Sequence, residues 1–272
     1  MNALGKWPNA PLAYVVTEIR FGRILSLESF ASTLQELISG SFPRLLPGHA
    51  FRLAFTSQGV TQDMQPRFTF VSTDSRQCVV LQDETLSVHV TQYRDFEAFA
   101  ETLGVVWDAW ARTRPNTFVE RLGLRYWDVV ADELGLSCGQ FFADPFASMS
   151  TLWPHHRLSR GAHELSFEIA DPFPHQVQGR ISVAPPSVQP LPANFAPAPE
   201  ILLPERVLSL INKGAATQAS VGHIDIDASA DIKELFHTQR LIDAATALHD
   251  AESSLFKVIT SVTGQAAWKG GK

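Results

Sequence analysis

The sequence is short of cysteine, of long apolar runs and of basic runs. Its 272 residues include two cysteines, Cys78 and Cys138, too few for a thiolate zinc site or a disulfide framework. No stretch approaches the run of about 18 apolar residues that a membrane-spanning helix needs. The opening residues, MNALGKWPNAPLAYVV, lack the basic start and apolar core of a secretory signal. We therefore expect a cytoplasmic protein without a membrane segment, in which both cysteines are small core residues.

The charge balance is acidic and the composition is that of a folded protein. Lys and Arg number 22 against 28 Asp and Glu, which gives a formal charge of −6 at pH 7. No run of Lys and Arg of the kind that follows a phosphate backbone is present, so nucleic acid is not the expected partner. Apolar residues make up 45% of the chain and charged residues 18%, which is typical of a globular core.

Motifs of nucleophilic and nucleotide-dependent catalysis are also missing. The chain has no Gly-x-Ser-x-Gly elbow, no phosphate-binding glycine loop ahead of a lysine and no dinucleotide fingerprint. Catalytic groups converge in space rather than along the chain, so this lack alone does not exclude an enzyme. It favours a noncatalytic protein that needs no cofactor.

The first half of the chain alternates between strand and helix periods. Residues 10–22 are rich in β-branched and aromatic residues, and a helical stripe follows from Ser26 to Gly40. Asp95 is a candidate N-cap for a second helix that contains Phe96, Phe99, Leu103, Val106 and Trp110. Between the helices we expect antiparallel strands, because the breaks are too short for crossover helices. These strands are 51–57, 67–73, 77–83 and 86–92.

The second half repeats this arrangement loosely. A poorly patterned stretch through Trp153, with the adjacent His155 and His156, predicts a loop, and a helical stripe from Leu241 to Ile259 closes the chain. We expect an α+β fold with antiparallel sheets and helices mainly on one face, in two loosely similar halves, 1–115 and 116–272. The expected strands of the second half are 117–130, 163–170, 175–184, VLSLIN at 207–212, and 219–227.

A proline-rich stretch interrupts the second half. Residues 184–204 hold seven of the 17 prolines, and proline at this density blocks the hydrogen bonds of a strand ladder. We expect a long surface excursion. The alternative is a proline-rich ligand for an aromatic groove on a partner.

Four blocks of sequence resemble a known family. They are NAPLAYVVTEIRF at 9–21, VERLGLRYWDVV at 119–130, HIDID at 223–227 and LHDAESSLFKVIT at 248–260. In their order and spacing they are similar to a sporadically distributed family of uncharacterised bacterial proteins of roughly 250 to 270 residues. The resemblance covers nearly the whole chain. It implies an accessory role and carries no agreed activity, and this sequence departs from the family pattern in the excursion and at Trp127.

The resemblance includes a Glu-x-Arg pattern, Glu18 and Arg20, and an Arg-x-Gly-Leu-Arg-Tyr pattern that contains Arg121 and Arg125. Arg121 and Arg125 are four residues apart on a strand and share a face, with Gly123 between them. If this strand lies beside residues 10–22, the four charged groups form a structural network. The alternative is an anion pocket for a phosphate or carboxylate, which two planar guanidinium groups bind well.

The stretch VGHIDID at 221–227 places His223, Asp225 and Asp227 at alternate positions of a strand. Ile224 and Ile226 then face the core, and the three polar residues form a solvated face. The alternative is a divalent metal site, with His237, Asp231 or His249 as further ligands. For His249 itself, at the edge of the apolar stripe of the last helix, we expect an interfacial residue hydrogen-bonded to a neighbour.

Together these features favour a noncatalytic binding protein. We expect its partner to be a protein encoded nearby, in a toxin-neutralising, immunity or defence module. The competing hypothesis is a metal-dependent hydrolase or nuclease that uses Asp225 and Asp227 as ligands and His223 as ligand or base.

Overall fold

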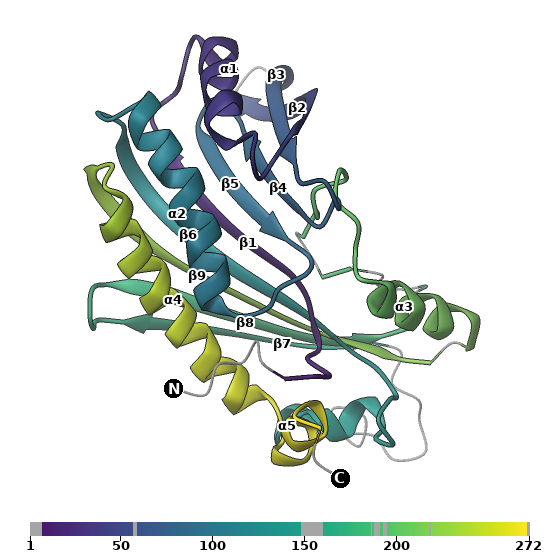
Figure 1. Ribbon diagram of the computed structural model, residues 1–272. Coiled ribbons are helices and arrows are strands. Elements are labelled where there is room, and N and C mark those ends of the chain that lie inside the picture. The colour runs from purple at the N-terminus through teal and green to yellow at the C-terminus, as the bar shows by residue number, and fades with distance from the viewer. Residues whose placement is uncertain are drawn as a thin grey trace.

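The strand expected at residues 10–22 lies at the centre of a nine-stranded antiparallel sheet (Figure 1). In the computed structural model, which describes residues 7–56, 59–147, 160–185, 187, 191–192, 195–217 and 219–270, this strand is β1 (Leu12–Phe21). It pairs with β5 (Thr85–Val90) on one side and β6 (Phe118–Val130) on the other. The other strands are β2 (Arg44–Thr56), β3 (Gly59–Val71), β4 (Gln77–Leu81), β7 (Gly161–Ile169), β8 (His175–Ala184) and β9 (Val221–Leu235).

The strand order is β2-β3-β4-β5-β1-β6-β9-β8-β7. Outward from the central β1–β6 pair, the strands on each side follow in the reverse of their order along the chain. On one side β1 is followed by β5, β4 and β3; on the other, β6 is followed by β9, β8 and β7. In each half, the strand next to the central pair, β5 or β9, is followed along the chain by a long helix. The expected boundary near residue 115 falls in the turn before β6, and both halves contribute to one sheet.

The long helices cover one face of this sheet, as the sequence predicts (Figure 1). They are α1 (Leu27–Ile38), α2 (Phe96–Thr113) and α4 (Thr238–Ile259), and the short elements η2 (Cys138–Phe141) and α5 (Val262–Trp268) pack at one end. Asp95 caps α2 as expected, since its carboxylate accepts from the backbone N–H of Ala98 at 2.8 Å. Trp107 and Trp110 of α2 are fully buried against the sheet. The α+β class is therefore confirmed.

The burial of β1 follows the alternation in its sequence. Val15, Thr17, Ile19 and Phe21 share one face, as expected, and all four are buried. The opposite face carries Val16, Glu18 and Arg20, which become more exposed toward the end of the strand.

The second face of the sheet is covered at one end by the described part of the proline-rich stretch and by α3 (Glu205–Thr217). Phe195, Ala198 and Ile201 are buried there against Tyr14 and Trp127. Glu200 extends the contact to β3, where it makes a bidentate ion pair with Arg67. The expectation of a surface excursion is thus wrong for this part of the stretch, because apolar residues between the prolines give it a buried side.

The strand expected at VLSLIN is also wrong, because these residues lie in α3. Val207, Leu210 and Ile211 recur at helical spacing and pack against the cluster around Trp127. A short apolar run fits both the helix period and the strand period, and its packing against neighbouring elements decides which one forms.

Cys78 and Cys138 are buried free thiols, as expected. Within the described ranges, none of the helices has both the length and the apolar character needed to cross a membrane. The loop expected around Trp153, His155 and His156 lies outside the described residues.

Candidate functional site

The part of the second sheet face that α3 leaves open carries most of the site residues expected from the sequence. We call it the charged face and define it by Glu18 and Arg20 of β1, Arg121 and Arg125 of β6, Gln178 and Arg180 of β8, and Asp225 and Asp227 of β9. Five of these residues, together with Val16, Gly123 and Leu124, line a depression of about 180 Å³. The five are Glu18, Arg20, Arg121, Arg125 and Asp227.

The strand register brings these charges together. Glu18 lies opposite Gly123 and Arg20 opposite Arg121 across the β1–β6 pair, while Arg125 lies opposite Asp227 across the β6–β9 pair. Gly123 has no side chain, so it forms the floor of the depression, with Glu18 directly opposite on β1 and Asp227 diagonally across on β9. A Cβ atom there would meet only backbone oxygens at 3.9 Å, an ordinary contact distance. The glycine thus leaves space above the sheet.

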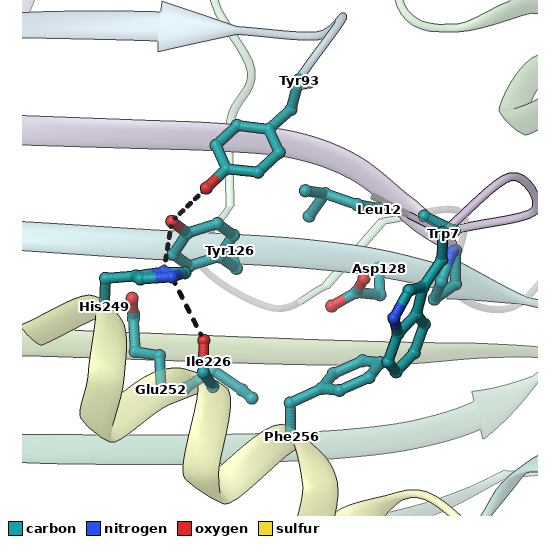
Figure 2. Close-up of a pocket in the computed structure, with 12 residues that line it drawn as sticks. Trp7, Leu12, Tyr93, Tyr126, Asp128, Ile226, His249, Glu252 and Phe256 are labelled. Carbon is teal, nitrogen blue, oxygen red and sulfur yellow. Dashed lines mark hydrogen bonds between the residues drawn. The ribbon is translucent and has the colours of Figure 1, made fainter. Parts of the chain in front are cut away.

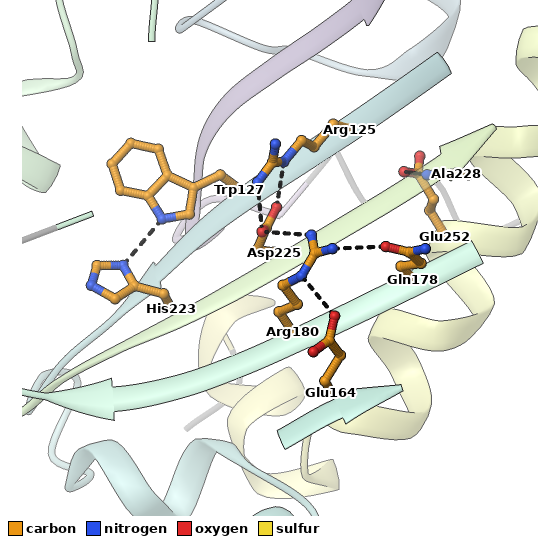
Figure 3. Close-up of polar contacts among 9 residues, drawn as sticks. All are labelled: Arg125, Trp127, Glu164, Gln178, Arg180, His223, Asp225, Ala228 and Glu252. Atoms are coloured by element: carbon orange, nitrogen blue, oxygen red, sulfur yellow. Dashed lines mark hydrogen bonds and ion pairs between the residues drawn. The ribbon is translucent and has the colours of Figure 1, made fainter. Parts of the chain in front are cut away.

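Asp225 is the most buried member of the charged face, with 1% of its side chain exposed (Figure 3). The guanidinium group of Arg125 donates to both of its oxygens, from Nε at 2.6 Å and from Nη2 at 2.7 Å. Arg180 approaches from β8 with Nη1 3.6 Å from Oδ2, and it also contacts Gln178 and Glu164. Such a bidentate pair fixes the orientation of both side chains.

The surroundings of Arg125 keep it charged. Burial works to lower the pKa of this guanidinium, but the hydrogen bonds and charge of Asp225 outweigh burial and raise the pKa. The guanidinium also lies over the ring of Phe195, 5.0 Å from its centroid. Arg125 therefore links the charged face to the proline-rich stretch.

His223 and Asp225 are each only 1% exposed, so the predicted solvated strand face is wrong for these two residues. The expected burial of Ile224 and Ile226 is confirmed. Trp127 covers His223 and donates from Nε1 to its Nδ1 at 3.1 Å, and the two arginines cover Asp225. Both covering groups come from other strands, so the local alternation could not reveal them.

Among the carboxylates of the charged face, Glu18 and Asp227 are less fully paired than Asp225. Burial raises the pKa of Asp227, and its carboxylate accepts no hydrogen bond from the described residues, although three arginines lower the pKa in part. Burial also raises the pKa of Glu18, whose nearest cation is Arg20 at 3.5 Å. A cation placed between the two carboxylates would oppose the effect of burial on both pKa values.

The residues named for a metal site are not brought together. Asp231 pairs with Lys233, His237 caps α4 by accepting from the N–H of Arg240, and His249 lies on the helix-covered face. Among the described residues, no three His, Cys, Asp or Glu side chains form a group that would hold a metal ion. A cation at Asp225 would have to displace a guanidinium group.

The alternative anion pocket at Arg121 and Arg125 meets a similar obstacle. Arg125 is engaged by Asp225, and Nη2 of Arg121 donates to the hydroxyl of Ser229 at 2.7 Å. Two carboxylates, Glu18 and Asp227, stand beside them in the same depression. An incoming anion would be repelled by both.

Sequence reasoning did not single out Arg180, Gln178 or Glu164. The signal is present in HQVQGR, where Gln176, Gln178 and Arg180 alternate with Val177 and Gly179. It is the antiparallel pairing of β8 with β9 that places Arg180 opposite Asp225. His249 behaves as expected, as its Nδ1 is hydrogen-bonded to the hydroxyl of Tyr126. No protein-family model matches the chain, and no curated protein is significantly similar to it.

Proposed function

We propose that this protein is a noncatalytic binding protein that recognises a partner protein through the charged face. The observation that supports this proposal is the pair of incompletely neutralised carboxylates, Glu18 and Asp227, on either side of Gly123. In the proposed complex a lysine or arginine of the partner enters the depression between them. Its positive charge would stabilise the charged form of both carboxylates, which burial disfavours.

The remaining charges on the face suit a protein surface. Arg20 and Arg121 are exposed at the rim, where they can meet backbone carbonyls or acidic side chains that flank the inserted residue. Asp225 and its two arginines hold the strands beneath in fixed positions, so little ordering is needed on binding. A rigid surface with both signs of charge gives specificity more than affinity.

The biological setting that we propose follows from the family resemblance. A scattered accessory family fits a module in which the partner is encoded nearby, as in toxin neutralisation, immunity or defence. The depression between Glu18 and Asp227 restricts the proposed partners to proteins that present a basic side chain on an exposed segment.

Coexpression with the products of adjacent genes tests this proposal. We expect one product to copurify at one-to-one stoichiometry with the wild-type chain. It should be lost from the Glu18→Gln, Asp227→Asn double variant, because the inserted cation then has no counter-ion. A Gly123→Leu variant should also lose it, because the new side chain fills the depression.

The matched control is the Glu101→Gln, Asp108→Asn double variant, which makes the same charge change on the exposed side of α2. It should keep the partner. A partner that binds the depression variants as well as it binds the wild type would refute the proposed surface, and a wild-type chain that copurifies with none of these products would refute the proposed module.

A further inference from the structure

A small cavity lies on the helix-covered side of the sheet, between β6, β9 and α4 (Figure 2). Its volume is about 40 Å³. This is room for roughly three water-sized groups. Trp7, Leu12, Ile226 and Phe256 supply its apolar walls. Trp7 borders the cavity on its outer side, where its ring packs against Phe256 with ring centroids 6.2 Å apart.

Most polar groups around the cavity are already paired with one another. The hydroxyl groups of Tyr93 and Tyr126 are 3.1 Å apart, and the Tyr126 hydroxyl is 3.0 Å from Nδ1 of His249. His249 in turn approaches the hydroxyl of Ser253 and stacks on Phe96. Glu252, deeper in the fold, accepts from the backbone N–H of Ala228 through Oε1 at 3.1 Å.

Two carboxyl groups break this pattern. Oε2 of Glu252 is buried and has no hydrogen-bond partner among the described residues. Asp128 is 4% exposed, and its carboxyl group has no hydrogen bond to another of the described residues. Figure 2 shows the Asp128 carboxyl group pointing into the space that Leu12, Trp7 and Phe256 border. A buried carboxyl group without a donor is costly, so this one is suited to a ligand that supplies positive charge and N–H groups.

We propose that this cavity binds a small organic cation, a primary or methylated ammonium ion of about three heavy atoms, with Asp128 as its counter-ion. The ammonium N–H groups donate to the Asp128 carboxylate, and the alkyl part contacts Trp7, Leu12 and Phe256. Aromatic walls beside a carboxylate are a favourable environment for such cations. The small volume of the cavity favours small amines over larger ones.

Binding is coupled to a proton. Burial raises the pKa of Asp128 to about 8, so in the empty cavity at neutral pH the group is a neutral acid. When the ammonium ion binds, the Asp128 O–H bond breaks and the proton passes to solvent, leaving the carboxylate paired with the cation. The other titratable groups around the cavity are Tyr93, Tyr126, His249 and Glu252. Arg206 and Asp225 act on Asp128 at longer range, and Lys269 lies outside Trp7.

Ethylammonium chloride is the probe, titrated into the full chain and followed by NMR, with sodium chloride holding the ionic strength constant. The limit on affinity per ligand atom places the Kd at about 1 mM at pH 9. At pH 7 we expect binding about tenfold weaker, because a proton must leave first. Ethanol, a neutral molecule of the same size, should not bind measurably.

The Asp128→Asn variant should weaken ethylammonium binding at least tenfold at pH 9 and remove its dependence on pH. Asp250→Asn is the matched control, since it makes the same change on the exposed side of α4 and should bind like the wild type. No saturable binding by the wild type up to 50 times the expected Kd would overturn the proposal. Equal binding of ethanol would do the same, as would an Asp128→Asn variant that binds like the wild type. The pH and ethanol comparisons need only the wild-type chain, so they decide the question even if a variant fails to fold.

Discussion

Replacing Asp128 with asparagine is expected to stabilise the protein at alkaline pH and to leave it nearly unchanged near pH 4. Burial raises the pKa of Asp128 to about 8 in the folded chain, against about 3.9 in an unfolded one. Below pH 4 both states are protonated. Between the two values only the folded state holds the proton, so the free energy of unfolding falls by about 1.4 kcal/mol for each pH unit. Above pH 8 both states are ionised and the penalty is constant.

Asparagine has nearly the same shape and no charge to desolvate. The difference in unfolding free energy between Asp128→Asn and the wild type should therefore grow in favour of the variant from pH 4.5 to pH 7.5, reaching about 3 kcal/mol or more. Urea titrations at five pH values in this range measure it. Asp250→Asn, on the exposed side of α4, should show no such trend. A constant difference across the range would mean that Asp128 is ionised in the folded protein.

The second large effect concerns the buried ion pair of the charged face. Arg125→Met is expected to lower the free energy of unfolding by about 3 kcal/mol, because the buried Asp225 carboxyl group loses its bidentate partner. Arg180, at 3.6 Å, compensates only in part. Chemical denaturation at pH 7 provides the measurement.

The Arg125→Met, Asp225→Leu double variant separates loss of the pair from loss of packing. It should be at least about 2 kcal/mol more stable than Arg125→Met, because no buried charge is left unpaired. Arg180 retains Glu164 and Gln178 in this variant. Arg20→Met, which removes an exposed arginine of the same face, should cost less than about 1 kcal/mol. If the Arg125→Met variant were as stable as Arg20→Met, the ion pair would have no structural role.

The periodicity of the chain predicted those parts of the fold that depend on neighbouring residues. The alternation of Val15, Thr17, Ile19 and Phe21 marked the buried face of β1, and Asp95 marked the start of α2. The four charged residues Glu18, Arg20, Arg121 and Arg125 were expected to meet only if their two strands paired, and β1 does pair with β6.

The burial of His223 and Asp225 could not be predicted in this way. Trp127, Arg125 and Arg180 cover them from strands that are far away along the chain. VLSLIN was ambiguous for a related reason, since only the packing of Val207 against the sheet identifies it as helix.

The buried acids did leave a signal in the sequence. Leu248, Glu252, Leu255 and Ile259 follow one helical stripe, and Leu122, Leu124, Tyr126 and Asp128 follow one face of a strand. An acid at a core position of each pattern breaks the local rule, which is where a functional or strained site is expected. The outer wall of the cavity depends on Trp7, and no local sequence pattern connects the segment around Trp7 to α4.

The mirrored strand order has a consequence for how the chain is made. Residues 12 to 113 can pair β1 with β5 and close α2 over them before the rest is synthesised, but the other edge of β1 is then unprotected. β6 is the next strand to follow α2, and it is the one that pairs with this edge. In the second half, as in the first, the outermost strand is made first after the central one, and the strand beside the central pair is made last. Thus β9 joins β6 after β7 and β8 are made, as β5 joins β1 after β2, β3 and β4. The strand that is central in the finished sheet is thus an edge for only a short time during synthesis, which limits its opportunity to pair with another chain.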